Sequence, residues 1–165
     1  MKPALLVVDI QNVWLDDNKE LRKSVEKRVD VINEAIQSFR RSKRPIIVVY
    51  HEDKEVGSLP GTKRFEVHET VRINKADIRV TKRYPSAFSK TELEAILRKE
   101  GCDTVAIVGL SASGCALATY FGAMDCGFRP YLVQGGVASH SEAHVRFAEE
   151  ICDTLNVHAL DQLLR

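Results

Sequence analysis

Cys115 stands where an apolar stretch meets an alanine-rich stretch, at the end of the run TVAIVGLSASGC over residues 104–115. This pattern predicts a buried strand, a turn of small residues and a helix that begins at Cys115. The N-terminus of a helix carries unpaired N–H groups and positive dipole charge, which favour a thiolate and lower the pKa of a thiol. The same N–H groups can bind a developing oxyanion. The segment therefore offers a nucleophile and an oxyanion stabiliser for acyl transfer.

Two further polar side chains follow apolar stretches, Asp9 after residues 5–8 and Lys82 after the β-favouring residues 78–81. An aspartate in this place can cap the next turn, or it can be the general base for a nearby thiol. A lysine is commonly a solvated charge, but beside a thiol it lowers the thiol pKa and stabilises negative charge. Cys115 itself can be a buried core thiol. The local sequence leaves both interpretations of each residue open.

Short apolar segments alternate with helical periodicity along the chain, and these elements must position the three side chains. We expect strands over residues 4–8, 46–50, 78–81, 104–109, 129–133 and 155–158. We expect five helices. The first covers residues 21–39, the second follows a capping box at 89–92 and ends at residue 101, and the third covers 115–126. The fourth begins at Ser139 or Ser141 and ends at Ile151, and the fifth is short and lies at the C-terminal end. Residues 51–77 have no clear period and are expected to form a long loop with one short element around residues 65–71; such loops are usually functional.

The alternation predicts an α/β fold, a three-layer α/β/α sandwich around a mainly parallel sheet of about six strands. A chain of 165 residues is most simply a single domain, 1–165. Ligands of such sheets bind beyond the carboxyl ends of the strands. Asp9, Lys82 and Cys115 all follow strands, so they are expected at that one edge.

The composition limits the kinds of partner that the protein can bind and indicates its cellular compartment. The net charge of +1, with 44% hydrophobic and 28% charged residues, gives no basis for binding nucleic acid or a membrane surface. No apolar run approaches the roughly 18 residues of a spanning helix, and no signal region precedes the first strand, so we expect a cytoplasmic protein. The other cysteines, at positions 102, 126 and 152, form no CxxC pair or zinc spacing and are expected to be reduced, buried thiols.

Four segments together resemble the isochorismatase-like cysteine hydrolases, a family that includes nicotinamidases and N-carbamoylsarcosine amidases. Residues 7–12 (VVDIQN) match VVD-x-QN, residues 61–66 resemble GTPG-x-E, residues 82–88 match K-x-x-x-SAF, and the turn before Cys115 resembles G-V-x-T-x-x-C. The resemblance spans residues 5 to about 151. Three places depart from it: Lys63-Arg64 replaces Pro-Gly, Tyr84-Pro85 stands where Arg-Tyr is common, and Ala112-Ser113-Gly114 lacks the usual threonine.

The resemblance implies the strand order 3-2-1-4-5-6 and a catalytic triad. Asp9 would be the base that takes the thiol proton and later activates water, Lys82 would lie beside both partners, and Cys115 would be the nucleophile. A cis peptide bond is implied at Leu110–Ser111. The N–H groups of Ser111 and Cys115 would then form the oxyanion hole.

The resemblance also places Trp14, His51, Tyr84 and Leu110 in the substrate pocket. Trp14 can equally be a core residue. Nicotinamidases bind a metal through an Asp and two or more His after the second strand, but here the loop holds only His51 before the GT segment. Since a metal needs several ligands, we expect no metal and no other cofactor, and we expect His51 to hydrogen-bond near the pocket.

Two features stay open between a structural and a functional interpretation. Lys63 and Arg64 either are solvated surface charges or attract an anionic substrate. Gly114, Ala118 and Gly122 are spaced for close packing, either on the sheet or against another subunit. Because family members are commonly oligomers, we expect a homodimer or homotetramer that binds a small-molecule substrate.

The sequence thus predicts a cysteine hydrolase that cleaves a C–N bond of a small amide or carbamoyl substrate through a thioester on Cys115. The first alternative is an isochorismatase-type vinyl-ether hydrolase, which needs the acid more than the thiol. The second is a non-catalytic binding module on the same fold. A thiol-redox protein is a weaker alternative, because no resolving cysteine lies close to Cys115 in the sequence.

Overall fold

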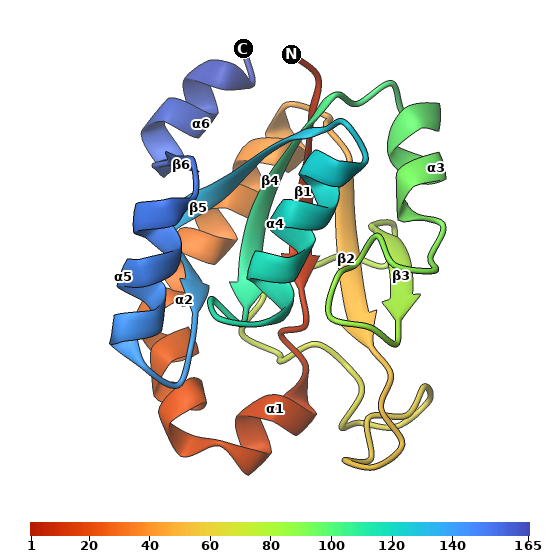
Figure 1. The fold of residues 1–165 in the computed structure, drawn as a ribbon, viewed down its shortest axis with the longest axis vertical. Helices are drawn as coiled ribbons and strands as arrows, with labels where there is room; N and C mark the ends of the chain where they lie inside the picture. The colour runs from red at the N-terminus through yellow and green to blue at the C-terminus, as the bar shows by residue number, and fades with distance from the viewer.

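Six parallel strands form a single sheet in the order β3-β2-β1-β4-β5-β6 in the computed structural model, which describes all residues 1–165 (Figure 1). The strands are β1 (Pro3–Val8), β2 (Ile46–His51), β3 (Ile78–Lys82), β4 (Thr104–Leu110), β5 (Arg129–Ala138) and β6 (Thr154–Leu155). Every neighbouring pair is parallel. The predicted α/β class, the parallel sheet and the strand order implied by the resemblance are confirmed.

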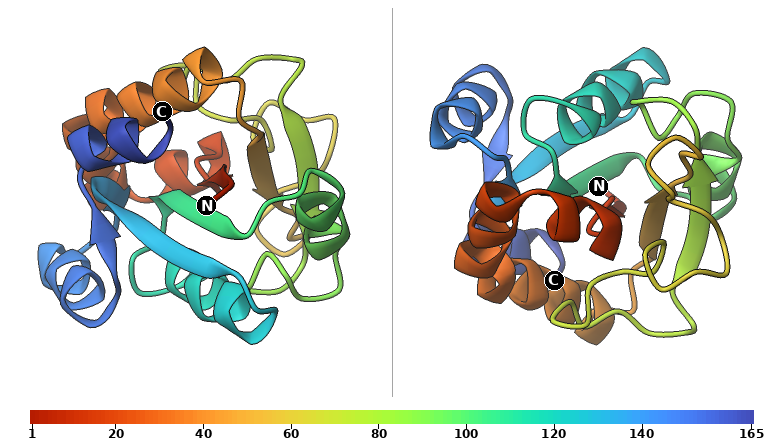
Figure 2. Two further views of the ribbon diagram at one scale, coloured as in Figure 1. Left: turned by 90° about the horizontal axis from the view of Figure 1, so that it is seen from above. Right: turned by 90° about the horizontal axis from the view of Figure 1, so that it is seen from below.

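Helices cover both faces of the sheet (Figures 1 and 2). They are α1 (Asn12–Asp17), α2 (Lys19–Arg41), α3 (Leu93–Lys99), α4 (Cys115–Asp125), α5 (Glu142–Ile151) and α6 (Val157–Leu163). Alternate residues of β1 point to opposite faces: Leu5 and Val7 pack in the core under α2 and α6, whereas Leu6 and Val8 pack under α3, α4 and α5. This double coverage explains why the strands are continuous apolar runs.

Three element boundaries differ from those that the sequence predicted. The sixth strand, expected at 155–158, ends at Leu155, because Asn156 caps α6 by accepting a hydrogen bond from the Ala159 N–H at 2.8 Å. The capping box at 89–92 does not form. Helix α3 begins only at Leu93, whose N–H donates to the Thr91 hydroxyl oxygen at 3.3 Å. Strand β5 continues to Ala138, beyond the expected end at residue 133.

The loop between β2 and β3 is long, as expected, but it contains no helix or strand, so the short element expected around residues 65–71 is absent. It crosses the carboxyl edge of the sheet beside the short helix α1 (Figure 2). The backbone pairs Gln11 with Val67 and Asp53 with Ser58, and the rings of Tyr50 and Phe65 stack at 5.1 Å. These contacts attach the loop to the strands, so that it forms one wall of the region above them.

No helix of the structure is both long enough and apolar enough to cross a membrane.

Candidate active site

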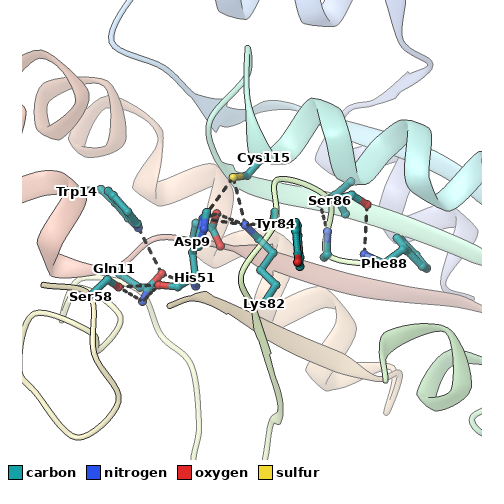
Figure 3. Close-up of polar contacts among 12 residues, drawn as sticks. Asp9, Gln11, Trp14, His51, Ser58, Lys82, Tyr84, Ser86, Phe88 and Cys115 are labelled. Carbon is teal, nitrogen blue, oxygen red and sulfur yellow. Dashed lines mark hydrogen bonds and ion pairs between the residues drawn. The ribbon is translucent and has the colours of Figure 1, made fainter. Parts of the chain in front are cut away.

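Asp9, Lys82 and Cys115 meet at the carboxyl edge of the sheet (Figure 3). Asp9 follows β1, Lys82 ends β3, and Cys115 is the first residue of α4. The Lys82 ammonium lies 2.9 Å from Asp9 Oδ2 and 3.1 Å from Cys115 Sγ. The Lys82 and Asp9 side chains are only 0% and 4% exposed. The structure therefore brings the three residues together as a buried ion pair that contacts a thiol.

Local backbone geometry turns the Asp9 side chain into the site. Asp9 has a left-handed backbone with φ of 55°, a conformation that aspartate tolerates better than most residues. Its N–H donates to the Val49 carbonyl at 3.0 Å. Beside it in β4, Gly109 has φ of 118°, and a Cβ there would collide with the Val8 carbonyl oxygen. A glycine at this position is what lets β1 and β4 approach so closely beneath the site.

The Lys82 ammonium has two more neighbours. His51 Nδ1 lies 3.0 Å away, and the Tyr84 carbonyl oxygen lies 3.1 Å away. His51 is the last residue of β2 rather than a loop residue, and its Nδ1 is also 3.7 Å from Cys115 Sγ. Because an ammonium group can only donate, Nδ1 is the acceptor in this short contact.

These residues do not fit a metal ion. The ligand atoms of Asp9, His51 and Cys115 lie within 4.8 Å of one another, which is close enough to hold one. However, the Lys82 ammonium lies within 3.1 Å of all three. A divalent ion among these ligands would be in contact with a buried cation, which Coulomb repulsion strongly disfavours.

The Cys115 thiol departs from the sequence prediction in its acidity. Burial, together with the nearby Asp9 carboxylate, raises the pKa of Cys115 to about 12, although Lys82 opposes the shift. The expectation of a lowered pKa at the helix start is therefore wrong for the resting protein. The thiol stays protonated at neutral pH, so a base must remove its proton when it reacts.

Asp9 has an oxygen available for that proton. Its Oδ2 binds Lys82, whereas its Oδ1 is buried with no hydrogen-bond partner. An unpaired buried carboxylate oxygen is costly, and such groups are characteristic of reactive sites.

The turn before Cys115 presents free N–H groups. The Leu110–Ser111 peptide bond is cis, as the resemblance implied. The Gly114 and Ala116 N–H groups donate to the Ser111 carbonyl oxygen, at 3.0 and 3.2 Å. The Ser111 and Cys115 N–H groups donate to no carbonyl or side chain of this turn, and are available to an oxyanion.

A pocket of about 340 Å³ opens onto Cys115. Its lining consists of Asp9, Trp14, Leu21, His51, Asp53, Leu110, Ser111, Gly114 and Cys115. Trp14, His51 and Leu110 thus lie where the resemblance placed them, and the Trp14 ring is 5.7 Å from the His51 ring. Figure 3 shows Trp14 on one side of the reactive groups.

Tyr84 is a correction to the predicted pocket. Its ring is not among the pocket lining, is 42% exposed, and lies under the Lys90 ammonium at 4.8 Å. Only its backbone carbonyl takes part in the site, through Lys82. The following Pro85 and the Ser86–Phe88 turn direct the side chain outward, where Lys90 also donates to its hydroxyl.

Gln11 is a fully buried residue to which the sequence interpretation gave no role. Its amide oxygen accepts from the His51 N–H at 2.8 Å and from the Trp14 indole at 3.3 Å. Its amide nitrogen donates to the carbonyls of Phe65 and His51 and to the Ser58 hydroxyl. Gln11 therefore holds two pocket walls together (Figure 3). In the sequence, the only indication of this role is that Gln11 belongs to the motif of residues 7–12.

Arg64 and Gly122, two of the residues that the sequence left open, have contacts within the chain. Arg64 pairs with Asp17 at 2.7 Å, and neither Lys63 nor Arg64 lines the pocket. A Cβ at Gly122 would collide with the Ser86 hydroxyl, so this glycine allows α4 to pack against the segment after β3.

The fold and this Asp-Lys-Cys cluster define a class of hydrolase, and comparison with known proteins identifies the family. The isochorismatase domain model matches residues 3–158, so the chain belongs to the isochorismatase family of hydrolases. The chain is 27% identical over 163 residues to the uncharacterised isochorismatase family protein YddQ of Bacillus subtilis, covering 96% of this chain and 88% of YddQ.

Some of the relatives have named activities. The chain is 39% identical over 77 residues to maleamate amidohydrolase of Pseudomonas putida, which covers 46% of this chain and 36% of that protein. The solved structure of N-carbamoylsarcosine amidase from Thermoplasma acidophilum superposes with a TM-score of 0.80 and 28% identity, covering 95% and 97% of the two chains.

Proposed function

We propose that this protein is a cysteine hydrolase that cleaves the C–N bond of a small amide or carbamoyl compound through a thioester on Cys115. The observation that carries the proposal is the contact of a buried Asp9–Lys82 ion pair with the Cys115 thiol, at the base of a pocket. The amidase relatives support this bond type. The proposal needs no metal or cofactor and treats residues 1–165 as one cytoplasmic hydrolase domain.

In the first half of the reaction, Asp9 accepts the thiol proton as Cys115 Sγ attacks the substrate carbonyl carbon. The raised pKa of Cys115 makes this transfer necessary, since little thiolate exists beforehand. The negative charge that develops on the carbonyl oxygen is stabilised by the N–H groups of Ser111 and Cys115. The nitrogen leaves as ammonia or an amine after receiving the proton from Asp9, and the thioester remains.

In the second half, Asp9 takes a proton from water, which attacks the thioester carbonyl. The second tetrahedral oxyanion uses the same N–H groups, and Sγ leaves and recovers its proton. The Lys82 ammonium, which lies 3.1 Å from Sγ in the resting site, stabilises the sulfur whenever it carries negative charge. His51 and the Tyr84 carbonyl hold the ammonium in that position.

The test combines turnover with trapping of the intermediate. The protein is incubated with a panel of small amides and carbamoyl compounds, ammonia release is followed, and acid-quenched samples are examined by mass spectrometry. We expect an acyl adduct on Cys115 and no turnover by Cys115→Ala. Cys126→Ala, at the other end of α4, is the matched control and should keep its activity.

Two outcomes would replace the proposal. Hydrolysis of a vinyl ether that survives Cys115→Ala would show the isochorismatase-type reaction. Ligand binding without turnover of any substrate class would show a binding module.

A further inference from the structure

The wall of the Cys115 pocket has an unusual charge balance. Apart from the reactive groups and His51, it is formed mainly by the apolar side chains of Trp14, Leu21 and Leu110. The remaining charged residue is Asp53, and its carboxylate makes no ion pair. The Asp9 charge, by contrast, is balanced by Lys82 at 2.9 Å. The pocket therefore carries one uncompensated negative charge.

Asp53 is held firmly in this wall. Its N–H donates to the Ser58 carbonyl at 3.0 Å, and its carbonyl accepts from the Ser58 N–H at 2.8 Å. Its Oδ1 accepts from the Glu55 N–H at 2.9 Å, and Oδ2 makes no hydrogen bond within the protein. Ser58 is itself tied to the His51 carbonyl, at the base of the site. The carboxylate is thus positioned by the same contacts that build the pocket.

The lining of the pocket contains no lysine or arginine, and the exposed Lys54 borders only the adjoining polar hollow that shares His51 and Asp53 with it. Arg83 pairs with Glu52 at 3.0 Å, Arg64 pairs with Asp17, and neither lines the pocket. Lys82 is fully buried and surrounded by acceptors. A carboxylate on the substrate would lose its hydration against an apolar wall and would also face Asp53.

We infer that the pocket selects small amides that are uncharged or carry an ammonium group, that it rejects those that carry a carboxylate, and that Asp53 determines this preference. The inference rests on the proposed function and names the substrate class of the same site. It separates this chain from relatives that are named for maleamate and N-carbamoylsarcosine, both of which carry a carboxylate.

The first test needs no substrate. Cys115 is modified with methanethiosulfonates that bear a methyl, a 2-(trimethylammonio)ethyl or a 2-sulfonatoethyl group. In each case Sγ loses its proton and attacks the divalent sulfur of the thiosulfonate, the S–SO2 bond breaks, a mixed disulfide forms and methanesulfinate leaves. Rates are taken from the Cys115 peptide by mass spectrometry and divided by those of free 2-mercaptoethanol. At low salt, we expect the normalised modification rate of the cationic reagent to exceed that of the anionic reagent by about tenfold. The ratio of the two rates should shrink near 0.5 M salt, where the Debye length is on the order of 4 Å.

Two variants test whether Asp53 causes the difference between the cationic and the anionic reagent. Asp53→Asn keeps the hydrogen-bond acceptor but removes the charge, and should reduce the cation-to-anion ratio by about threefold to tenfold. Glu55→Gln removes the same charge from an exposed position of the same loop outside the pocket, and should leave the ratio nearly unchanged. A native ratio that favours the anion, or equal effects of the two variants, would overturn the inference. If circular dichroism shows that Asp53→Asn is unfolded, the native ratio and its salt dependence decide.

The second test compares three amides of similar size: pentanamide, 4-aminobutyramide and succinamate. We expect succinamate to have the lowest kcat/KM and to gain relative to pentanamide in Asp53→Asn but not in Glu55→Gln. A preference for succinamate would overturn the inference and leave the proposed hydrolase intact. Failure of every amide would instead count against the proposed function, while the reagent ratio would still decide the charge preference.

Discussion

At the scale of single residues, the Lys82–Asp9 pair combines a structural and a chemical role. Both side chains are almost completely buried, so each charge depends on the other. The same ammonium contacts Sγ, so the pair cannot be altered without changing the electrostatics of the thiol. This coupling allows the two roles to be separated by a pair of substitutions.

Lys82→Met should reduce kcat by about 100-fold or more and lower the free energy of unfolding by about 3–5 kcal/mol, because Asp9 is left charged and unpaired. The double variant Asp9→Asn/Lys82→Met should regain most of that stability, yet stay inactive. Urea unfolding and turnover measure the two effects. Arg83→Met, which removes a neighbouring cation that is 70% exposed, is the control and should change little. Additive destabilisation in the double variant would contradict this interpretation.

The acidity of Cys115 predicts the pH dependence of its alkylation. Because its pKa is raised to about 12, the rate with iodoacetamide should keep rising from pH 6 to 10 without levelling. Asp9→Asn should move the profile to lower pH and Lys82→Met to higher pH, since the two charges have opposite effects on the pKa. A plateau with an inflection near pH 7 in the native protein would contradict the burial of this thiol.

The same shift affects stability with a definite sign. The folded protein retains the Cys115 proton above the pH at which the unfolded chain loses it. The stabilising contribution is therefore complete below the ordinary thiol pKa and is lost as the pH rises toward 12.

At the scale of the elements, the approach of β1 and β4 depends on Gly109. Gly109→Ala should lower the free energy of unfolding by about 4 kcal/mol, because the new methyl group meets the Val8 backbone. Gly127→Ala, also at a positive φ of 79° but in open space, should cost only about 1–2 kcal/mol. Thermal unfolding with calorimetry compares the two. Equal losses would show that the conformation, and not the contact, determines the effect.

The elements that the sequence predicted well are those whose apolar pattern is long or continuous. Helix α2 follows from apolar residues three and four apart, and β1 and β4 follow from unbroken apolar runs. Helix α1 was not predicted, because the Gln11 side chain caps no backbone N–H of the helix, and the Asn12 and Val13 N–H groups donate to the loop carbonyls of Glu66 and Arg64. Such contacts between distant segments leave no local pattern.

Some features of the candidate site could likewise be predicted from the sequence, and others could not. Asp9, Lys82 and Cys115 could be predicted, since strand ends and motifs mark them in the sequence. The outward direction of Tyr84, the raised pKa of Cys115 and the role of Gln11 could not be predicted. Each depends on burial, and on which side chains of other elements lie within about 4 Å.

At the scale of the whole molecule, large apolar side chains remain exposed on the helices that cover one face. Phe121 and Met124 of α4 are 44% and 52% exposed, and Phe147 and Ile151 of α5 are 54% and 47% exposed. We expect these helices to form the contact of a homodimer or homotetramer. Light scattering should give a mass above the 18.5 kDa of one chain, and Phe121→Asp with Phe147→Asp should lower it. Val56→Asp, in the loop after β2, is the control; a native mass of one chain would contradict the expectation.

Lys82 reaches the site from β3, the outermost strand, which is hydrogen-bonded to β2 alone, whereas Asp9 comes from the middle of the sheet. Edge elements detach at a lower free energy than the core of a domain. In the proposed mechanism, turnover therefore depends on β3, the least firmly held strand among those that supply the reactive groups. We expect mild heating to abolish activity reversibly while the helices are still folded. The loss of activity would then report the local unfolding of β3 at the edge of the sheet.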